Sequence, residues 1–341
     1  MKKKVAIMGA TGMVGQRFVS LLDEHPYFEV TSLYASKHSE NKKYGDTVNW
    51  MLEKPIPQYA QSMTVKSFEG NEGVEESILF SALPADVANI LEVELAKAGK
   101  FVFSNTSSHR YDRYVPILIP EVNPDHFEAV RFQETRGFIV TNANCSTTGL
   151  VIPLKALLER FAIRSVFVVT MQAISGGGLN GVSALQITGN IIPFIEKEEE
   201  KIELETRKIL GSFNGDFILN DIFIFARANR VPVREGHTEV AFVDLDASVE
   251  EVKEAFSDFR GIPQELLLPT APKEVIRVFD NVNHPQPILD VNANSGMSVS
   301  VGRIRKSGNF ITFTLLSHNT VRGAAGGSVL NAEFAYRRGW I

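Results

Sequence analysis

Apolar and polar positions follow two different patterns along the chain, and the first pattern covers residues 1–141. Short apolar runs predict strands at residues 4–8, 29–34, 77–82, 101–105 and 138–141. Amphipathic stretches at residues 13–24 and 84–98 lie between these runs and predict helices. Because strands that alternate with helices at this spacing are typical of βαβ units, this part of the chain is expected to form a parallel sheet.

The second pattern begins after residue 145, where longer β-rich runs are separated by clusters of turn residues. Strands are expected at residues 164–173, 238–246, 275–279, 298–304 and 310–317, which suggests a mixed or antiparallel sheet. Helices are expected at residues 194–210, at residues 248–259 after a capping box of Ser248 and Glu251, and from residue 320 onwards. No low-complexity linker separates the two patterns, so we expect two closely packed domains with a cleft between them.

Composition narrows the class of protein. The 341 residues carry a formal net charge of −5 and are 44% hydrophobic, which is sufficient for two cores and gives no basic field for nucleic acid or an anionic membrane. No apolar stretch reaches the ~18 residues of a membrane span. The apolar run at residues 5–8 is too short for a signal peptide. A single cysteine permits no internal disulfide, so a cytoplasmic protein with no membrane or nucleic-acid partner is expected.

A glycine-rich segment, Gly-Ala-Thr-Gly-Met-Val-Gly at residues 9–15, follows the first expected strand and opens the first expected helix. Glycines at such a junction allow a tight turn and let backbone N–H groups approach a pyrophosphate at the helix N-terminus. This context favours a Rossmann-type dinucleotide-binding domain over a glycine-rich turn of a generic α/β fold. The candidate cofactor contacts in this loop are Gly9, Thr11, Gly12, Met13 and Val14.

The end of the second expected strand indicates which dinucleotide is preferred. Enzymes that use NAD usually carry Asp or Glu there to hold the ribose 2′-hydroxyl. Residues 34–43 contain small hydroxyls and cationic groups, with no acid at the strand end. Ser36 and Ser39 are therefore candidate contacts to a 2′-phosphate, which favours NADP; the alternative is a solvated polar loop.

Cys145, the only cysteine, lies between an apolar run at residues 137–140 and a helix expected to begin near Thr147. A thiol at a strand-to-helix junction can face the helix N-terminus, whose dipole favours the nucleophilic thiolate. A buried packing cysteine is the alternative, but the neighbouring Asn, Ser and Thr residues argue against it.

Further candidates for chemistry lie near expected strand ends. His237 follows Gly236 at the start of an apolar strand and could serve Cys145 as a base, although spacing alone does not bring the two together. Arg110 and Arg230 could grip a carboxylate or phosphate with paired hydrogen bonds, or be ordinary surface arginines. The loop containing Ser175, Gly176 and Gly177 could approach a ligand with its backbone or be only a turn.

Taken together and in order, these motifs resemble the aspartate-β-semialdehyde dehydrogenase family, in its archaeal and fungal branch. The resemblance runs over essentially the whole chain. It is carried by residues 9–15, by Thr-Asn-Ala-Asn-Cys-Ser-Thr at residues 141–147 and by Gln-Ala-Ile-Ser-Gly-Gly-Gly at residues 172–178. Arg-Val-Pro-Val-Arg-Glu-Gly-His-Thr at residues 230–238 and the segment at residues 318–327 complete it.

The resemblance implies a role for each candidate. Cys145 would be the acyl-forming nucleophile, His237 the acid/base and Gln172 a residue that orients the substrate. Arg230 would bind the substrate carboxylate and Glu198 its amino group, while Arg110 and Lys201 would hold phosphate. Asn144 would be a further substrate contact, and the cofactor would also contact Ser81, the loop at residues 175–177 and Asn319. For Glu198 and Lys201 the alternative is a solvated helix face. His38 departs from the arginine expected in a 2′-phosphate loop, which weakens the NADP preference without reversing it.

The implied fold is α/β: a Rossmann-type NADP-binding domain formed by residues 1–144 and 320–341, and an α+β catalytic and dimerisation domain of the glyceraldehyde-3-phosphate dehydrogenase-like type at residues 145–319. The implied reaction is the NADP-dependent conversion of L-4-aspartyl phosphate to L-aspartate 4-semialdehyde and phosphate through a Cys145 thioester, in lysine, threonine and methionine biosynthesis. A homodimer or homotetramer without a metal is expected. The alternatives are malonyl-CoA reductase or another acyl-CoA reductase on the same fold, and a non-catalytic cofactor sensor.

Overall fold

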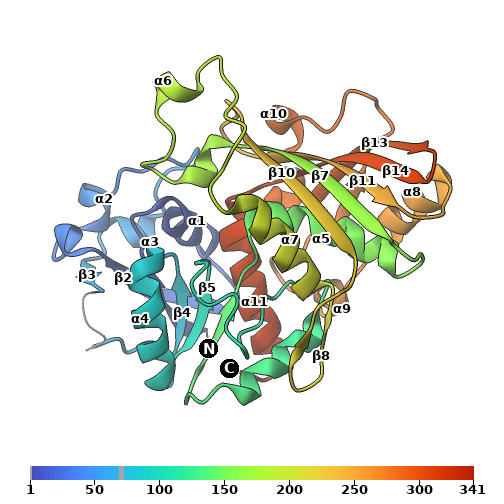
Figure 1. Ribbon diagram of the computed structural model, residues 1–341. Helices are drawn as coiled ribbons and strands as arrows, with labels where there is room; N and C mark the ends of the chain where they lie inside the picture. Colours follow the sequence, from blue (N-terminus) through green and yellow to red (C-terminus); the bar gives the residue numbers. More distant parts are fainter. Residues whose placement is uncertain (1, 69–72) are drawn as a thin grey trace.

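The computed structural model describes residues 2–68 and 73–341, which form two sheet-based domains packed side by side (Figure 1). The sheet of the first domain has the strand order β3-β2-β1-β4-β5-β6, and all of its strand pairs are parallel. Its strands are β1 (Lys3–Met8), β2 (Phe28–Ala35), β3 (Val65–Ser67), β4 (Ile78–Ser81), β5 (Phe101–Ser104) and β6 (Phe138–Thr141). The predicted parallel sheet is confirmed.

Helices pack on this sheet, and one of them is the last helix of the chain. The principal ones are α1 (Met13–Leu21), α4 (Ala85–Lys97) and α11 (Gly326–Arg337), accompanied by α2 (Tyr44–Thr47), α3 (Gln58–Gln61), η1 (Lys37–Ser39) and η2 (Pro124–Phe132). Buried α11 residues such as Val329 and Phe334 pack in one core with Phe18 of α1 and Phe80 of β4. The C-terminal helix therefore belongs physically to the first domain, and both chain ends lie on the same side of the molecule (Figure 1).

The second domain is built on a mixed sheet in the order β10-β7-β11-β14-β13-β12. β10 and β7 are parallel, as are β12 and β13, whereas β7–β11, β11–β14 and β13–β14 are antiparallel. The strands are β7 (Ser165–Gln172), β10 (Phe223–Arg230), β11 (His237–Asp244), β12 (Ile276–Val278), β13 (Val299–Ser307) and β14 (Phe310–Ser317), with a small separate hairpin of β8 (Ser212–Phe213) and β9 (Phe217–Ile218).

One face of this mixed sheet is covered and the other is open. Helices α5 (Cys145–Leu158), α7 (Glu198–Ile209) and α8 (Val249–Asp258) contribute Leu154, Ile202 and Phe256 to the core over the covered face. The remaining short elements lie in the connections: η3 (Ile174–Gly177), α6 (Ala184–Ile187), α9 (Ile262–Glu265), α10 (Pro287–Asp290), η4 (Ala293–Gly296) and the π-helical turn η5 (Val321–Ala325).

The structure differs from the sequence-based expectations at several boundaries. Strand β10 was not predicted, although its residues alternate between exposed and buried. Helix α5 begins at Cys145 rather than near Thr147, because Asn144 caps it. Helix α7 begins at Glu198 instead of residue 194, after Lys197 in the left-handed conformation. In the described part of the chain, no helix has the length and apolar character needed to span a membrane.

We expect Phe313→Ala to destabilise the second domain by about 3–5 kcal/mol, because Phe313 is buried under α8 with its ring centroid 5.3 Å from that of Phe256. Phe313→Leu, which keeps most of the volume, should cost about 1–1.5 kcal/mol. Urea unfolding followed by circular dichroism measures both, and equal losses for the two variants would contradict this account of the core.

Candidate active site

Cys145 is the first residue of α5, at the junction between the two domains. Asn144 caps this helix: its Oδ1 accepts hydrogen bonds from the backbone N–H groups of Ser146 at 3.0 Å and Thr147 at 3.1 Å. An Asn at this position satisfies backbone donors that would otherwise lack partners at the helix start. The thiol is partly accessible and lines a cavity, as a nucleophile requires.

His237 lies beside this cysteine, at the first position of β11. Its Nε2 atom is 3.1 Å from Cys145 Sγ, and the ring is fully buried. Its Nδ1 atom accepts a hydrogen bond of 3.0 Å from the backbone N–H of Ala173. A nitrogen that accepts a hydrogen bond carries no proton, so this contact assigns the proton of the neutral ring to Nε2, facing the sulfur.

Burial holds both partners in their neutral forms. It lowers the pKa of His237 to about 3, and the positive charge of Arg230 and the neighbouring His318 act in the same direction. Burial also raises the pKa of the Cys145 thiol, as does Glu198, while Arg230, Arg110 and the Ser146 N–H act against it. The helix N-terminus acts in the expected direction, since the Ser146 N–H lowers the pKa of the thiol, but desolvation outweighs the helix and the arginines, and the net pKa is raised.

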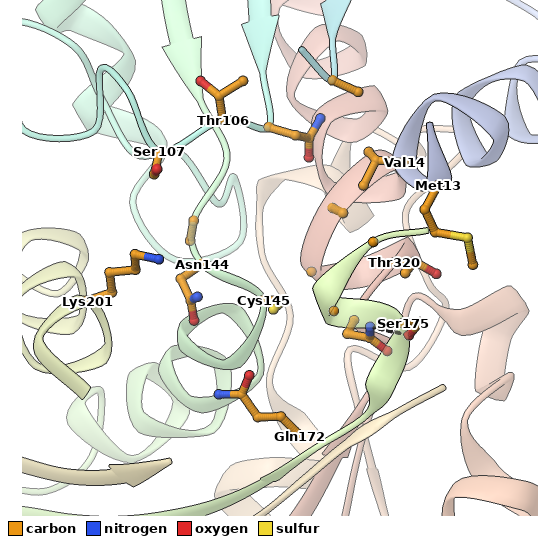
Figure 2. Close-up of a pocket in the computed structure, with 18 of the residues that line it drawn as sticks. Met13, Val14, Thr106, Ser107, Asn144, Cys145, Gln172, Ser175, Lys201 and Thr320 are labelled. Carbon is orange, nitrogen blue, oxygen red and sulfur yellow. Dashed lines mark hydrogen bonds between the residues drawn. The ribbon is translucent and has the colours of Figure 1, made fainter. Parts of the chain in front are cut away.

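The cavity in front of Cys145 has a volume of about 350 Å³ and lies between the domains (Figure 2). The first domain contributes the loop before α1, and the second contributes the ends of β7 and β10. The sequence-predicted residues that line it are Gly12, Met13, Val14, Arg110, Asn144, Cys145, Gln172, Ser175, Gly176, Glu198, Lys201, Arg230 and Asn319. Residues predicted from separate motifs thus meet around one space.

The glycine-rich loop has the close packing that a dinucleotide loop needs. Gly9 has a φ of 82°, and a Cβ there would come within 2.5 Å of the Ala82 carbonyl oxygen. A Cβ at Gly15 would lie 2.1 Å from the Gly9 oxygen. At the N-cap, Gly12 offers no side chain to the first-turn N–H groups of α1, which leaves them available to an anion.

The loop after β7 faces this glycine-rich loop across the cavity. Asn319 donates a 2.7 Å hydrogen bond to Ser175 Oγ and accepts one of 2.9 Å from Gly236 N–H. A Cβ at Gly176 would lie 2.9 Å from Arg230 Nη1 and 3.3 Å from His237 Cε1, so only glycine leaves both side chains in place. These contacts connect the candidate cofactor residues to Arg230 and to the start of β11, where His237 lies.

Other predicted cofactor residues lie outside the cavity lining, which does not include Gly9, Thr11, Ser36, Ser39, Ser81 and Gly177. Gly9 and Thr11 belong to the loop itself, and Ser36 is exposed directly after β2. Ser39 is buried, with its hydroxyl accepting a 3.4 Å hydrogen bond from Thr47, and Ser81 is buried at the end of β4. Of the two serines near the end of β2, Ser36 is the more accessible to a ligand.

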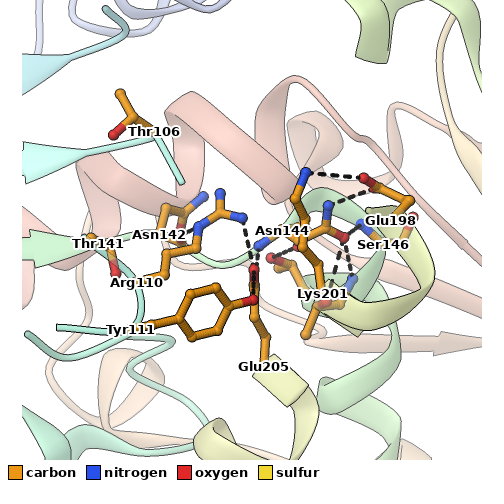
Figure 3. A network of polar contacts seen from close by, with 12 residues as sticks. Thr106, Arg110, Tyr111, Thr141, Asn142, Asn144, Ser146, Glu198, Lys201 and Glu205 are labelled. Atoms are coloured by element: carbon orange, nitrogen blue, oxygen red, sulfur yellow. Dashed lines mark hydrogen bonds and ion pairs between the residues drawn. The ribbon is translucent and has the colours of Figure 1, made fainter. Parts of the chain in front are cut away.

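Several candidate substrate residues form a polar network (Figure 3), and Asn144 and Lys201 of this network lie on the other side of Cys145 from Ser175 and Met13 (Figure 2). Asn144 Nδ2 donates to Glu198 Oε1 at 2.6 Å, and Lys201 Nζ is 3.5 Å from Glu198 Oε2. Arg230 enters from the end of β10, its Nη1 donating to the Ala173 carbonyl at 2.8 Å. Burial lowers the pKa of this guanidinium, although it remains charged near neutrality.

Sequence reasoning missed two carboxylates that organise this region. Glu235 accepts hydrogen bonds from Arg17 of α1 at 3.1 Å and from Ser175 and Thr320 at 3.1 Å each, and so joins the domains two residues before His237. Glu205 accepts hydrogen bonds from Arg110 and from the Asn144 N–H. The signal for Glu205 was its position seven residues after Glu198, on the same helix face.

We expect alkylation of Cys145 by iodoacetamide to accelerate steadily from about pH 7 to about pH 9, without a plateau. A raised thiol pKa means that the reactive thiolate is a small fraction at neutrality and grows as the pH rises. As the only cysteine in the chain, Cys145 accounts for all labelling seen by mass spectrometry. A plateau near pH 6 would instead reveal a preformed thiolate–imidazolium pair.

Comparison with known proteins agrees with this geometry. Residues 4–130 match the family model "Semialdehyde dehydrogenase, NAD binding domain", and residues 154–322 match "Semialdehyde dehydrogenase, dimerisation domain". An aspartate-semialdehyde dehydrogenase of Archaeoglobus fulgidus is 47% identical over 341 residues, with 98% of each chain covered.

Solved structures of the same family superpose over nearly the whole chain. The Candida albicans aspartate semialdehyde dehydrogenase, crystallised with NADP, has a TM-score of 0.91 at 40% identity, with 100% of both chains covered. The Vibrio cholerae aspartate semialdehyde dehydrogenase II, complexed with ASA, has a TM-score of 0.81 at 26% identity and 99% coverage of both chains. The chain therefore belongs to the aspartate-semialdehyde dehydrogenase family.

Proposed function

We propose that the chain catalyses the reversible, NADP-dependent reductive dephosphorylation of L-4-aspartyl phosphate to L-aspartate 4-semialdehyde. The observation that carries this proposal is the 3.1 Å contact between Cys145 Sγ and His237 Nε2, beside a cavity with a dinucleotide loop on one side and an anion-binding network on the other. Such a reaction supplies a precursor for lysine, threonine and methionine biosynthesis, which we propose as its physiological role.

The residues around the glycine-rich loop fit NADP. The close approach at Gly9 and Gly15 leaves room for no side chain, and the α1 N-terminus faces the cavity with free N–H groups. Exposed Ser36, Lys37 and His38 after β2 suit a 2′-phosphate better than a ribose hydroxyl. The Candida albicans relative carries NADP. When bound, NADPH would supply the hydride that reduces the thioester carbonyl.

Cys145 would carry the acyl group. The thiol gives its proton to solvent water in the cavity, the sulfur attacks the acyl-phosphate carbon, the bond to the phosphate oxygen breaks so that phosphate leaves, and a thioester forms. The Ser146 and Thr147 N–H groups already donate to Asn144 Oδ1, so the Cys145 N–H at the start of α5 would stabilise the oxyanion of the tetrahedral intermediate. His237 donates its Nε2 proton in a hydrogen bond to sulfur, which would stabilise the thiolate before attack and again when the thiohemiacetal collapses to the aldehyde. Use of His237 as a base would require its proton to move to Nδ1, which faces the Ala173 N–H.

Charged side chains around the sulfur would select aspartyl phosphate. Arg230 would bind the α-carboxylate and Glu198 the amino group, while Arg110 and Lys201 would bind the phosphate. Gln172, buried at the end of β7, would orient the reacting carbonyl, and Asn144 would support Glu198 through its 2.6 Å hydrogen bond. The carboxylate of Glu198 argues against malonyl-CoA as substrate, because a malonyl group has no amino group to pair with it.

We further propose that the chain forms a homodimer through the open face of the mixed sheet. Phe225, Phe167 and Phe242 lie in register across β10, β7 and β11, and all three are exposed. Phe223 and Val169 extend the same apolar surface. A row of exposed aromatic side chains across three adjacent strands of an open sheet face is typical of a protein–protein interface, and the matching family model is described as a dimerisation domain.

The reaction is tested by NADPH formation from aspartate semialdehyde, NADP and inorganic phosphate. We expect activity that requires phosphate, and a loss of at least about 1,000-fold in Cys145→Ala, because no other thiol can form the thioester. The same enzyme should not oxidise NADPH with malonyl-CoA. Phosphate-independent NADPH formation, or full activity in Cys145→Ala, would refute the proposal.

The dimer is tested by light scattering of Phe225→Asp, which places a charge at the β10 end of the aromatic row. We expect a monomer at concentrations where the parent protein is a dimer. Ile90→Asp is the matched control, since Ile90 is exposed on α4 of the other domain. An unchanged mass for Phe225→Asp would contradict this interface.

A further inference from the structure

Helix α7 presents one line of charged residues to the active site. Glu198, Lys201, Glu205 and Lys208 follow one another at spacings of three, four and three, which puts them on a single helix face. The first two line the cavity, whereas Glu205 and Lys208 lie deeper and are buried. The proposed reaction assigns no role to this deeper pair.

Glu205 uses its two oxygens to connect two different parts of the site (Figure 3). Its Oε1 accepts a 2.9 Å hydrogen bond from Arg110 Nη1, and its Oε2 accepts one of 2.7 Å from the backbone N–H of Asn144. The side chain is fully buried, so both contacts form away from water, where charge-assisted hydrogen bonds are strong. A single carboxylate therefore holds the proposed phosphate-binding arginine and the residue that precedes the nucleophile.

Further hydrogen bonds hold both the side chain and the backbone of Arg110 in place. Its Nε donates to the Asn142 carbonyl at 3.0 Å, while Lys208 Nζ donates to the Arg110 carbonyl at 2.6 Å and to the Val115 carbonyl at 2.9 Å. The guanidinium is therefore oriented by Glu205 and Asn142. Within the described residues no hydrogen bond engages its Nη2 group, which leaves this group for a ligand in the cavity that Arg110 lines. A carboxylate beside a phosphate site weakens attraction for the anion, so its benefit must lie in geometry.

We propose that Glu205 is a positioning residue, which fixes the phosphate-binding guanidinium of Arg110 relative to the Asn144–Cys145 backbone so that the carbonyl carbon of the acyl phosphate faces the sulfur. The inference rests on the proposed function, because it requires Arg110 to bind phosphate. Misplacement of reacting groups by about 1 Å can reduce a rate by about 100-fold, which sets the scale of the expected effect.

Glu205→Gln tests this arrangement with almost no change of volume. An amide has one acceptor oxygen, so its NH₂ group must face either the Arg110 or the Asn144 donor, and one contact is lost. We expect kcat/KM for inorganic phosphate to fall by about 10- to 100-fold, with KM for NADP unchanged within about twofold. Glu200→Gln is the matched control, because it removes the same charge from an exposed position of α7 and should leave both constants unchanged.

A double-mutant cycle separates positioning from general structural damage. If Glu205 acts through Arg110, the Glu205→Gln effect on kcat/KM for phosphate should shrink to about threefold or less in an Arg110→Lys background, since the guanidinium that Glu205 orients is already gone. Independent, multiplicative losses would overturn the proposal. Glu205→Asp keeps the charge, but its shorter side chain withdraws the carboxylate from both donors. We expect it to behave like Glu205→Gln, and it serves as the test variant if Glu205→Gln does not fold.

A second readout does not depend on turnover. We expect Glu205→Gln to change the rate of Cys145 alkylation by iodoacetamide at least about threefold and to weaken protection by inorganic phosphate about tenfold. Unchanged alkylation and protection would overturn the positioning role. If the parent protein shows no phosphate-dependent NADPH formation, the proposed function is refuted, whatever the result for Glu205. Altered alkylation in Glu205→Gln would in that case still support the link between Glu205 and the backbone at Cys145.

Discussion

The first turn of α5 is the constraint on which the rest of the site depends. It starts directly after the last strand of the parallel sheet, is capped by Asn144, and packs so closely against the C-terminal segment that a Cβ at Gly323 would lie 2.7 Å from Cys145 Cβ. This contact brings the C-terminal part of the chain against Cys145, and α11 returns to the first domain from there. The helix start thus joins the cofactor side and the substrate side at a single residue.

Burial sets the protonation states of Cys145 and His237 in the unliganded site. The thiol and the imidazole lie 3.1 Å apart, yet desolvation raises the pKa of Cys145 and lowers that of His237, so both are neutral before ligands arrive. The surrounding charges are arranged in opposed pairs, such as Arg110 with Glu205 and Arg17 with Glu235. In the proposed mechanism such pairs orient side chains more than they attract anions, because each arginine is largely neutralised by its own partner.

Local sequence rules located most of the fold. Strands β1, β2, β6 and β14 were predicted because their apolar residues form continuous or alternating runs, and the capping box at Ser248 identified the start of α8. Strand β10 was missed because arginine and asparagine interrupt its apolar residues, although they occupy positions in a half-covered sheet. The start of α7 was placed too early, since residues 194–197 carry a helix-like composition but Lys197 adopts a left-handed conformation.

By itself, the sequence determined the chemical groups: one thiol, a histidine after a glycine, a glycine-rich turn and arginines within recognisable motifs. Only the tertiary structure decided that Cys145 and His237, 92 positions apart, are in contact, that Ala173 selects the ring tautomer, and that Glu205 joins Arg110 to Asn144. The physical reason is that hydrogen-bond partners and desolvation depend on packing between distant segments. Periodicity and capping signals, in contrast, are properties of neighbours along the chain.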